Sequence, residues 1–288
     1  MKTEIKSQKS EANEQSFVLQ VSSIKYQPFY FLLLTLYMAF SSFTTDEYIL
    51  QNSLPLTHAK FTTDHLGNAY VLVENQLLQF DSIGKPKANY ADPTAGVLTS
   101  VDAANPLKIL LFFRDFAQVH VLNNKLALES TIQLRNAGIE QPLLVCQSYL
   151  DGYWIFDQQD FSLKKLNLNL QLAYQSGNMN QTLGYSLQPE SITEAGDFVY
   201  MNNPATGILI FDKYGSYYKT IPVTGVSALQ IVGKDLLYVK NNKLMRYNFS
   251  TVNENEVILP AHDSLLNARF EQHQLFLLTT ASLTFYSY

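Results

Sequence analysis

Apolar and polar positions alternate in one recurring pattern from residue 58 to the C-terminus. A polar or glycine turn is followed by a short apolar and aromatic run, a second turn, and another apolar run. The pattern occurs six times, and its units end at markers that lie 41, 45, 45, 36 and 39 residues apart. Short apolar runs between turn residues predict β-hairpins. The unit endings are Phe80 with Asp81, Val121 with Leu122, Leu166 with Asn167, Phe211 with Asp212, Tyr247 with Asn248, and Tyr286 with Ser287.

The mean spacing of these units is about 41 residues, and a strand-rich repeat of roughly 40 to 45 residues is typical of propeller blades. Such units fill residues 42–288 without a long stretch left over. The sequence therefore predicts an all-β protein, a six-bladed β-propeller.

The first and fourth units share a specific motif. An aromatic residue, an aspartate and a glycine occur at the same spacing in both, as Phe80, Asp81 and Gly84 and again as Phe211, Asp212 and Gly215. This pattern resembles blades of the NHL and YWTD-type six-bladed propellers, in which an aromatic–Asp pair ends the third strand and the glycine opens the turn to the fourth. At the level of repeat form the resemblance covers residues 45–288, but the motif itself occurs in two of six units.

The sixth unit lacks a fourth strand, because the sequence stops at Tyr288, directly after the third. Residues 48–54 precede the first unit and have no other strand to pair with. We predict that they complete the last blade beside residues 283–286. Pairing the two ends removes the exposed edges that an open ring would have.

Most aromatic residues, including the only tryptophan, Trp154, are expected in the core between blades, because wedge-shaped sheets need bulky side chains at alternating positions. The single cysteine, Cys146, follows three apolar residues and is expected to be a small core residue. The histidines have no metal-ligand spacing and are expected in turns or at the surface: His58, His65, His120, His262 and His273.

Residues 29–40 form an apolar run preceded by Lys25. The run is too short to span a bilayer as a helix and is typical of the central region of a secretory signal peptide. Ala39 and Ser41 have the spacing that a signal peptidase prefers. We therefore predict a signal peptide with a polar N-terminal extension over residues 1–41, and a periplasmic or secreted propeller over residues 42–288 with no stable membrane insertion after cleavage. The alternatives are a buried strand or an uncleaved anchor.

Composition narrows the partners. Charged residues make up 16% of the chain and the net charge is -5. Basic residues are scattered, so the stripe that neutralises phosphates is missing and nucleic acid is not expected as a partner. The chain is rich in Asn, Gln, Tyr and Lys with few Arg, which is typical of Bacteroidetes-like genomes.

Catalytic motifs are sparse: the sequence has no HExxH, no GxSxG and no phosphate loop. Calcium-dependent lactonases of the propeller fold gather carboxylates at one mouth of the channel, from the starting ends of the innermost strands. In this chain the comparable positions lie near His58, Thr99, Pro142, Glu190, Ser227 and Asp263. The candidate site residues at this mouth are His58, Glu190 and Asp263. They supply at most two carboxylates, few for a cation that prefers six or more oxygens, so no metal or other cofactor is expected.

Two functions are consistent with these patterns. The favoured hypothesis is a non-enzymatic propeller that binds a protein partner in the cell envelope, such as an accessory of a secretion machine of the type IX export kind. The alternative is a calcium-dependent, lactonase-like hydrolase acting at the channel mouth. Clustered carboxylates and amides in the channel would favour the enzyme, whereas a channel filled with apolar side chains would favour the scaffold.

Overall fold

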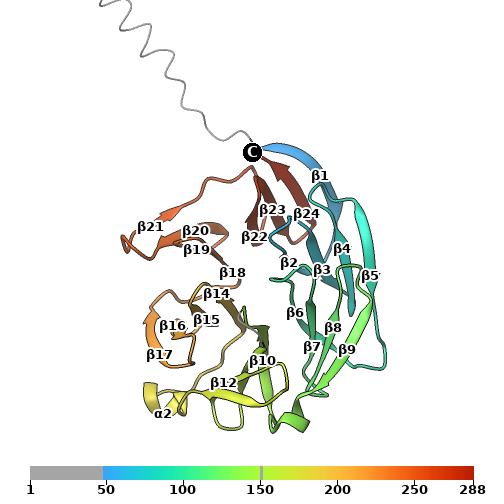
Figure 1. The fold of residues 1–288 in the computed structure, drawn as a ribbon. Helices are drawn as coiled ribbons and strands as arrows, with labels where there is room; N and C mark the ends of the chain where they lie inside the picture. Colours follow the sequence, from blue (N-terminus) through green and yellow to red (C-terminus); the bar gives the residue numbers. More distant parts are fainter. Residues whose placement is uncertain (1–47, 150–151) are drawn as a thin grey trace, which may run out of the picture. The chain divides into compact units, whose positions relative to one another are not determined.

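The computed structural model describes residues 48–149 and 152–288, so the predicted signal peptide, residues 1–41, lies outside the described residues. The described part of the chain forms six four-stranded antiparallel sheets arranged as a ring of blades (Figure 1). This arrangement confirms the predicted six-bladed β-propeller.

Five blades are built from consecutive strands, counted here from the innermost strand outward. Blade 1 contains β2 (Lys60–Thr63), β3 (Ala69–Val73), β4 (Gln76–Phe80) and β5 (Pro86–Tyr90). Blade 2 contains β6 (Leu98–Asp102), β7 (Ile109–Phe113), β8 (Gln118–Leu122) and β9 (Leu128–Gln133). Blade 3 contains β10 (Pro142–Gln147), β11 (Tyr153–Asp157), β12 (Ser162–Leu166) and β13 (Leu172–Gln175).

The remaining blades follow in the same order. Blade 4 contains β14 (Ser191–Ala195), β15 (Phe198–Asn203), β16 (Gly207–Asp212) and β17 (Tyr217–Ile221). Blade 5 contains β18 (Leu229–Val232), β19 (Asp235–Lys240), β20 (Lys243–Asn248) and β21 (Glu254–Glu256). Blade 6 contains β22 (Leu265–Glu271), β23 (Gln274–Thr279), β24 (Ser282–Ser287) and β1 (Ile49–Pro55). A short 3-10 helix (Leu134–Ala137) precedes β10, and helix α2 (Met179–Leu183) precedes β14.

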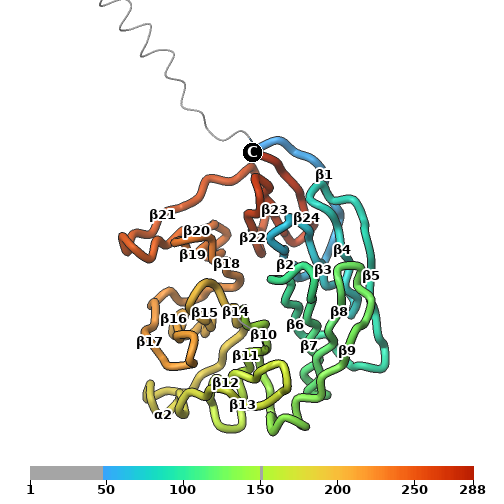
Figure 2. Tube along the Cα trace, in the orientation of Figure 1, coloured from blue at the N-terminus to red at the C-terminus, as the bar shows by residue number. Residues whose placement is uncertain are grey.

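The ring closes where the first and last described strands meet. Strand β1 pairs antiparallel with β24, and Leu54 lies opposite Leu283. The Gln51 side chain adds a hydrogen bond of 2.8 Å from its Nε2 to Ser287 Oγ. The tube in Figure 2 shows the blue N-terminal strand beside the red C-terminal one. The predicted closure is therefore confirmed, and β1 takes the outermost place in blade 6.

The innermost strands all run in the same direction, because each blade has four antiparallel strands and its outermost strand leads to the next innermost one. The ring consequently has two different faces. We call the face where the innermost strands begin the start face, and the face where they end the end face. The end face carries the turns between the first and second and between the third and fourth strands of each blade.

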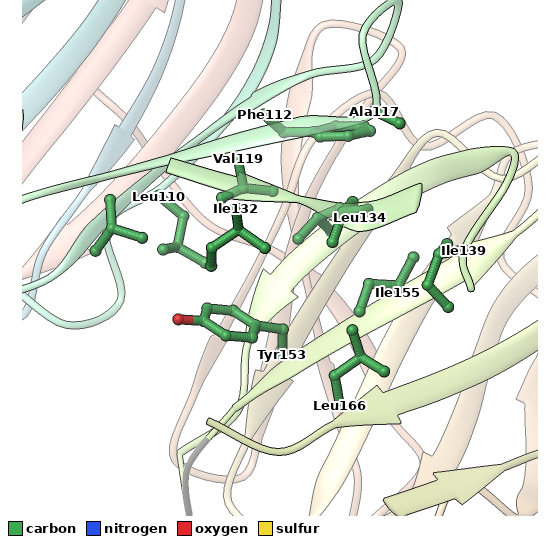
Figure 3. Close-up of a cluster of buried hydrophobic side chains, with 12 residues drawn as sticks. Leu110, Phe112, Ala117, Val119, Ile132, Leu134, Ile139, Tyr153, Ile155 and Leu166 are labelled. Atoms are coloured by element: carbon green, nitrogen blue, oxygen red, sulfur yellow. The ribbon is translucent and has the colours of Figure 1, made fainter. Parts of the chain in front are cut away.

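Apolar side chains fill the spaces between neighbouring blades. Figure 3 shows one such cluster, in which Leu110 and Ile132 of blade 2 lie near Tyr153 and Ile155 of blade 3. In the next space, Trp154 and Cys146 pack with apolar residues of blade 4. Trp154 and Cys146 are almost fully buried, which confirms the prediction that both are core residues.

The turn between the third and fourth strands explains the sequence markers. Asp81 Oδ1 accepts hydrogen bonds from the backbone N–H groups two and four residues later, as does Oδ1 of Asp212, Asn123 and Asn167. Such local bonds favour Asp and Asn in turns. The glycine of the motif has positive φ, and in blade 2 Leu126 adopts the same left-handed conformation, with φ of 57°. The degenerate units thus keep the turn without the motif, and the structural marker of blade 2 is Asn123, one residue after the predicted Leu122.

One histidine prediction was wrong. His120 lies on β8 and is buried, with its Nδ1 2.8 Å from the Tyr90 hydroxyl and its Nε2 2.5 Å from Gln118 Nε2. Its ring also packs on Phe113, at 4.6 Å between centroids. The imidazole therefore behaves as a core aromatic whose nitrogens have polar neighbours. The other histidines lie outside the strands, as predicted.

Candidate functional site

A cavity of about 1270 Å³ occupies the centre of the ring. All six blades contribute to its lining, and it extends from Arg114 and Glu190 on the start side to His65 and Gly233 on the end side. A concave site of this size with several polar groups is the default place to look for ligand binding.

The candidates predicted at the start mouth do not gather in this cavity. Glu190 lines it, with an exposed side chain, whereas His58 and Asp263 lie exposed in the loops before β2 and β22 and are not part of the lining. Thr99 and Ser227, two of the comparable positions, also line the cavity. A binding role for His58, Glu190 or Asp263 stays a prediction.

Charged side chains that were not predicted from the sequence line the cavity closer to the end mouth. Asp102, Glu194, Arg269 and Glu271 occupy the last three positions of their innermost strands, β6, β14 and β22. The available signal was a charged residue near the end of a short strand of mixed polar and apolar residues. That signal becomes specific only once the innermost strand of each blade is known.

Arg269 and Glu271 hold three blades together. Arg269 Nε donates a hydrogen bond of 2.7 Å to Thr63 Oγ1 in blade 1, and Thr63 Oγ1 donates one of 2.7 Å to Glu271 Oε1. From blade 5, Gln230 Nε2 donates to the same carboxylate oxygen over 2.8 Å. Arg269 Nη2 lies 3.9 Å from Glu271 Oε1. The two charges of blade 6 are therefore part of a network with both neighbouring blades.

Asp102 and Glu194 make the corresponding contacts to blade 3. Asp102 Oδ2 accepts a hydrogen bond of 2.6 Å from the Gln147 backbone N–H, and its Oδ1 accepts one from Ala104 N. Glu194 Oε2 accepts a bond of 2.6 Å from Tyr149 N. Hydrogen bonds to charged acceptors are stronger than neutral ones, so these contacts stabilise the spacing of the innermost strands.

Burial shapes the ionisation of this group. It raises the pKa of Asp102, against the hydrogen bonds from Ala104 and Gln147 and the charge of Arg269. Burial also raises the pKa of Glu271. It lowers the pKa of Arg269, while the nearby carboxylates of Glu271 and Asp102 raise that pKa. Asp102 and Glu271 act on Arg269, and Glu194 adds a third carboxyl group to the lining, so the end half of the cavity holds three carboxyl groups beside Arg269 and His65.

Cys146 stays a protonated core thiol. Burial raises its pKa well above the usual value, and the charges of Asp102 and Glu194 raise it further. Because the thiolate is the reactive form, a raised pKa makes this cysteine a poor nucleophile.

Within residues 48–149 and 152–288, no three His, Cys, Asp or Glu side chains are placed to hold one metal ion. Over the same residues, no helix is long and apolar enough to cross a membrane. The channel lining is neither a cluster of carboxylates around one point nor a filling of apolar side chains. It therefore has neither the lining expected for the enzyme nor the lining expected for the scaffold.

No protein-family model matches the chain, and no curated protein matches it. Solved structures do. Virginiamycin B lyase from Staphylococcus aureus is 12% identical with a TM-score of 0.58, covering 84% of this chain and 100% of that one. A chain of the mitotic checkpoint complex is 10% identical with a TM-score of 0.53, covering 85% and 94%. BBS1N, solved in complex with ARL6DN, is 14% identical with a TM-score of 0.50, covering 76% and 74%. At these identities the likeness shows the propeller fold alone.

Proposed function

We propose that the protein is a non-enzymatic β-propeller that binds a protein partner in the cell envelope. The observation that carries this proposal is the way the channel uses its polar groups. Asp102, Glu194 and Glu271 each accept hydrogen bonds from a neighbouring blade, so they stabilise the ring. A rigid ring that presents many loops is a good frame for binding residues.

Structural neighbours support protein binding as one use of this fold. BBS1N was solved with ARL6DN, and the mitotic checkpoint complex is an assembly of several proteins. Each of these structures aligns with most of this chain as a propeller. Their partners belong to those proteins, and only the mode of action is carried over here.

The envelope location rests on the apolar run at residues 29–40 and its flanking residues. If residues 1–41 are a signal peptide, the mature protein begins within a few residues of Ser42. Mass spectrometry of the protein from its source organism tests this. A protein outside the membrane that retains residues 1–41 would contradict the location. Within the envelope, we name an accessory role at a type IX-like export machine as the first function to examine.

Affinity purification from the source envelope, with and without a chelator, tests partner binding. We expect one protein to co-purify at a fixed ratio in both conditions. Recovery of the propeller alone, under conditions that preserve other envelope complexes, would contradict the proposal.

The second candidate is a hydrolase or lyase acting in the channel. Two observations favour it: the raised pKa of Asp102 and Glu271 inside a large cavity, which is a feature of many active sites, and the similarity to virginiamycin B lyase. The lactonase-like form of this candidate makes a sharp prediction. Ester or lactone hydrolysis that requires calcium and is abolished by Glu190→Gln would establish the enzyme and overturn the binding proposal.

A further inference from the structure

The end face exposes large apolar side chains around the channel mouth. In the turns that follow the innermost strands, or at the end of such a strand, lie Leu66, Leu107, Tyr149 and Val232, from blades 1, 2, 3 and 5. We call these four residues the inner ring. Tyr149 is 88% exposed and Leu107 is 67% exposed, so neither contributes much to the core.

A second set lies farther from the channel on the same face. These residues occupy the turns between the third and fourth strands of blades 1, 3, 4 and 5. They are Ile83, Leu168, Tyr214 and Val252. The ring of Tyr214 also packs edge-to-face on exposed Tyr174 of blade 3, at 5.4 Å between centroids. The apolar exposure is therefore spread over most blades at this face.

The start face differs. Its exposed large apolar side chains, among the described residues, are Val97, Phe116, Ile258 and Leu266. Single apolar residues at a surface need no explanation, but the larger number of exposed apolar side chains on the end face makes it the better candidate for an interaction surface.

Charge distinguishes the same two ends of the cavity. Near the end mouth the lining holds three carboxyl groups, Asp102, Glu194 and Glu271, beside Arg269 and His65. On the start side it includes Lys60 and Arg114 beside Glu190. Glu194 also joins the charged group to the apolar ring, because its Oε2 accepts the backbone N–H of Tyr149. Its Oε1 has no hydrogen-bond partner among the described residues.

We propose that the end face is the docking surface for the protein partner, and that this partner presents a lysine or arginine side chain to the acidic end of the channel, flanked by apolar residues that pack on the inner ring. The inference rests on the proposed binding function and adds the face and the partner's chemistry. A basic side chain is the complementary group, because three carboxyl groups line this mouth. The apolar residues around it would exclude water and strengthen that pair.

Selection of short random peptides displayed on phage, with the purified propeller as bait, tests this directly. Enriched peptides should carry a lysine or arginine next to apolar residues. Their affinity should fall about tenfold or more for Glu194→Gln, which retains an acceptor for Tyr149 N, and similarly for Leu107→Ser. The matched controls on the start side are Glu140→Gln and Val97→Ser, which should bind the same peptides as the unmodified protein.

Melting temperatures of all four variants check that the fold is intact. Those of the exposed positions, Leu107, Val97 and Glu140, should equal that of the unmodified protein, and that of Glu194→Gln, which keeps the acceptor for Tyr149 N, should stay close to it. Enrichment of acidic or purely apolar peptides would overturn the inference, as would peptides that lose affinity only with the start-side variants. A failure to enrich any peptide would also count against it. If affinity purification still yields a partner, these results contradict only docking at the end face and not partner binding. Failure of the docking proposal can therefore be distinguished from failure of the proposed function.

Discussion

The two mouths of the channel differ in how their polar side chains are held. At the start mouth, His58, Glu190 and Asp263 are exposed, and only Glu190 lines the cavity. Toward the end mouth, Arg269 and Glu271 are mostly buried and bonded to both neighbouring blades. Polar residues in the loops before the innermost strands are thus exposed, whereas those near the ends of these strands form hydrogen bonds that connect neighbouring blades.

The same contrast appears in the apolar surface. The end face exposes Leu107 and Tyr149 beside a mouth lined by three carboxyl groups, whereas the start face has fewer exposed apolar residues and includes basic lining residues. An enzyme needs convergent groups, while a docking surface needs a broad area with a few charged anchors. The end face has the exposed apolar residues that the docking proposal requires.

Both mouths depend on closure of the ring, so the largest effect should come from removing β1. A chain lacking residues 1–54 should melt about 10 °C or more below a chain lacking residues 1–41, because β24 then has an unpaired edge. Thermal unfolding followed by circular dichroism measures this. Equal melting temperatures would show that the closing strand is dispensable.

Two arginine variants distinguish the mouths energetically. Arg269→Leu should reduce the free energy of unfolding by about 3 to 5 kcal/mol, because Glu271 and Asp102 lose the guanidinium that compensates their charge. Arg114→Leu, at an exposed start-side position, should change it by less than about 0.5 kcal/mol. Urea unfolding of both variants measures the difference. Similar losses of stability for both would contradict the role of Arg269 in connecting the blades.

A smaller effect should appear in the pH dependence of stability. Burial raises the pKa of Glu271 above its usual 4.5. The folded chain therefore binds this proton more tightly than the unfolded chain, and stability falls as the pH rises from about 4.5 through the raised pKa. If the pKa of this carboxyl is one unit higher in the folded state than in the unfolded state, the difference corresponds to about 1.4 kcal/mol of stability.

Glu271→Gln removes this titration, so the stability of the variant relative to the unmodified protein should rise with pH across that window. Glu140→Gln serves as the control, and its stability relative to the unmodified protein should show no such rise. Urea unfolding at a series of pH values measures both. A constant difference between Glu271→Gln and the unmodified protein would contradict the role of burial.

The fold could be predicted because propeller blades are local structures. The hairpins need only short-range alternation and turn residues, and the repeat period supplies the blade number. Even ring closure followed from counting strands. The degenerate blades were harder, since Asn167 and Leu170 replace the Asp and Gly of the motif while making the same turn.

The polar groups near the end mouth could not be predicted in the same way. Asp102, Glu194 and Arg269 lie in different blades, and only ring closure brings them to one cavity. Their sequence neighbourhoods look like ordinary strand ends. His120 was misplaced for a related reason: a polar residue in an alternating strand can face a blade interface when Tyr90 and Gln118 lie beside its ring nitrogens.

Site-specific photo-cross-linking in the source organism can establish which face of the ring meets the partner. A photoreactive residue replaces Leu107 on the end face or, in a second strain, Val97 on the start face, both of which are exposed. We predict a cross-link to one envelope protein from position 107 and none from position 97. A cross-link to the partner from position 97 alone would contradict docking at the end face.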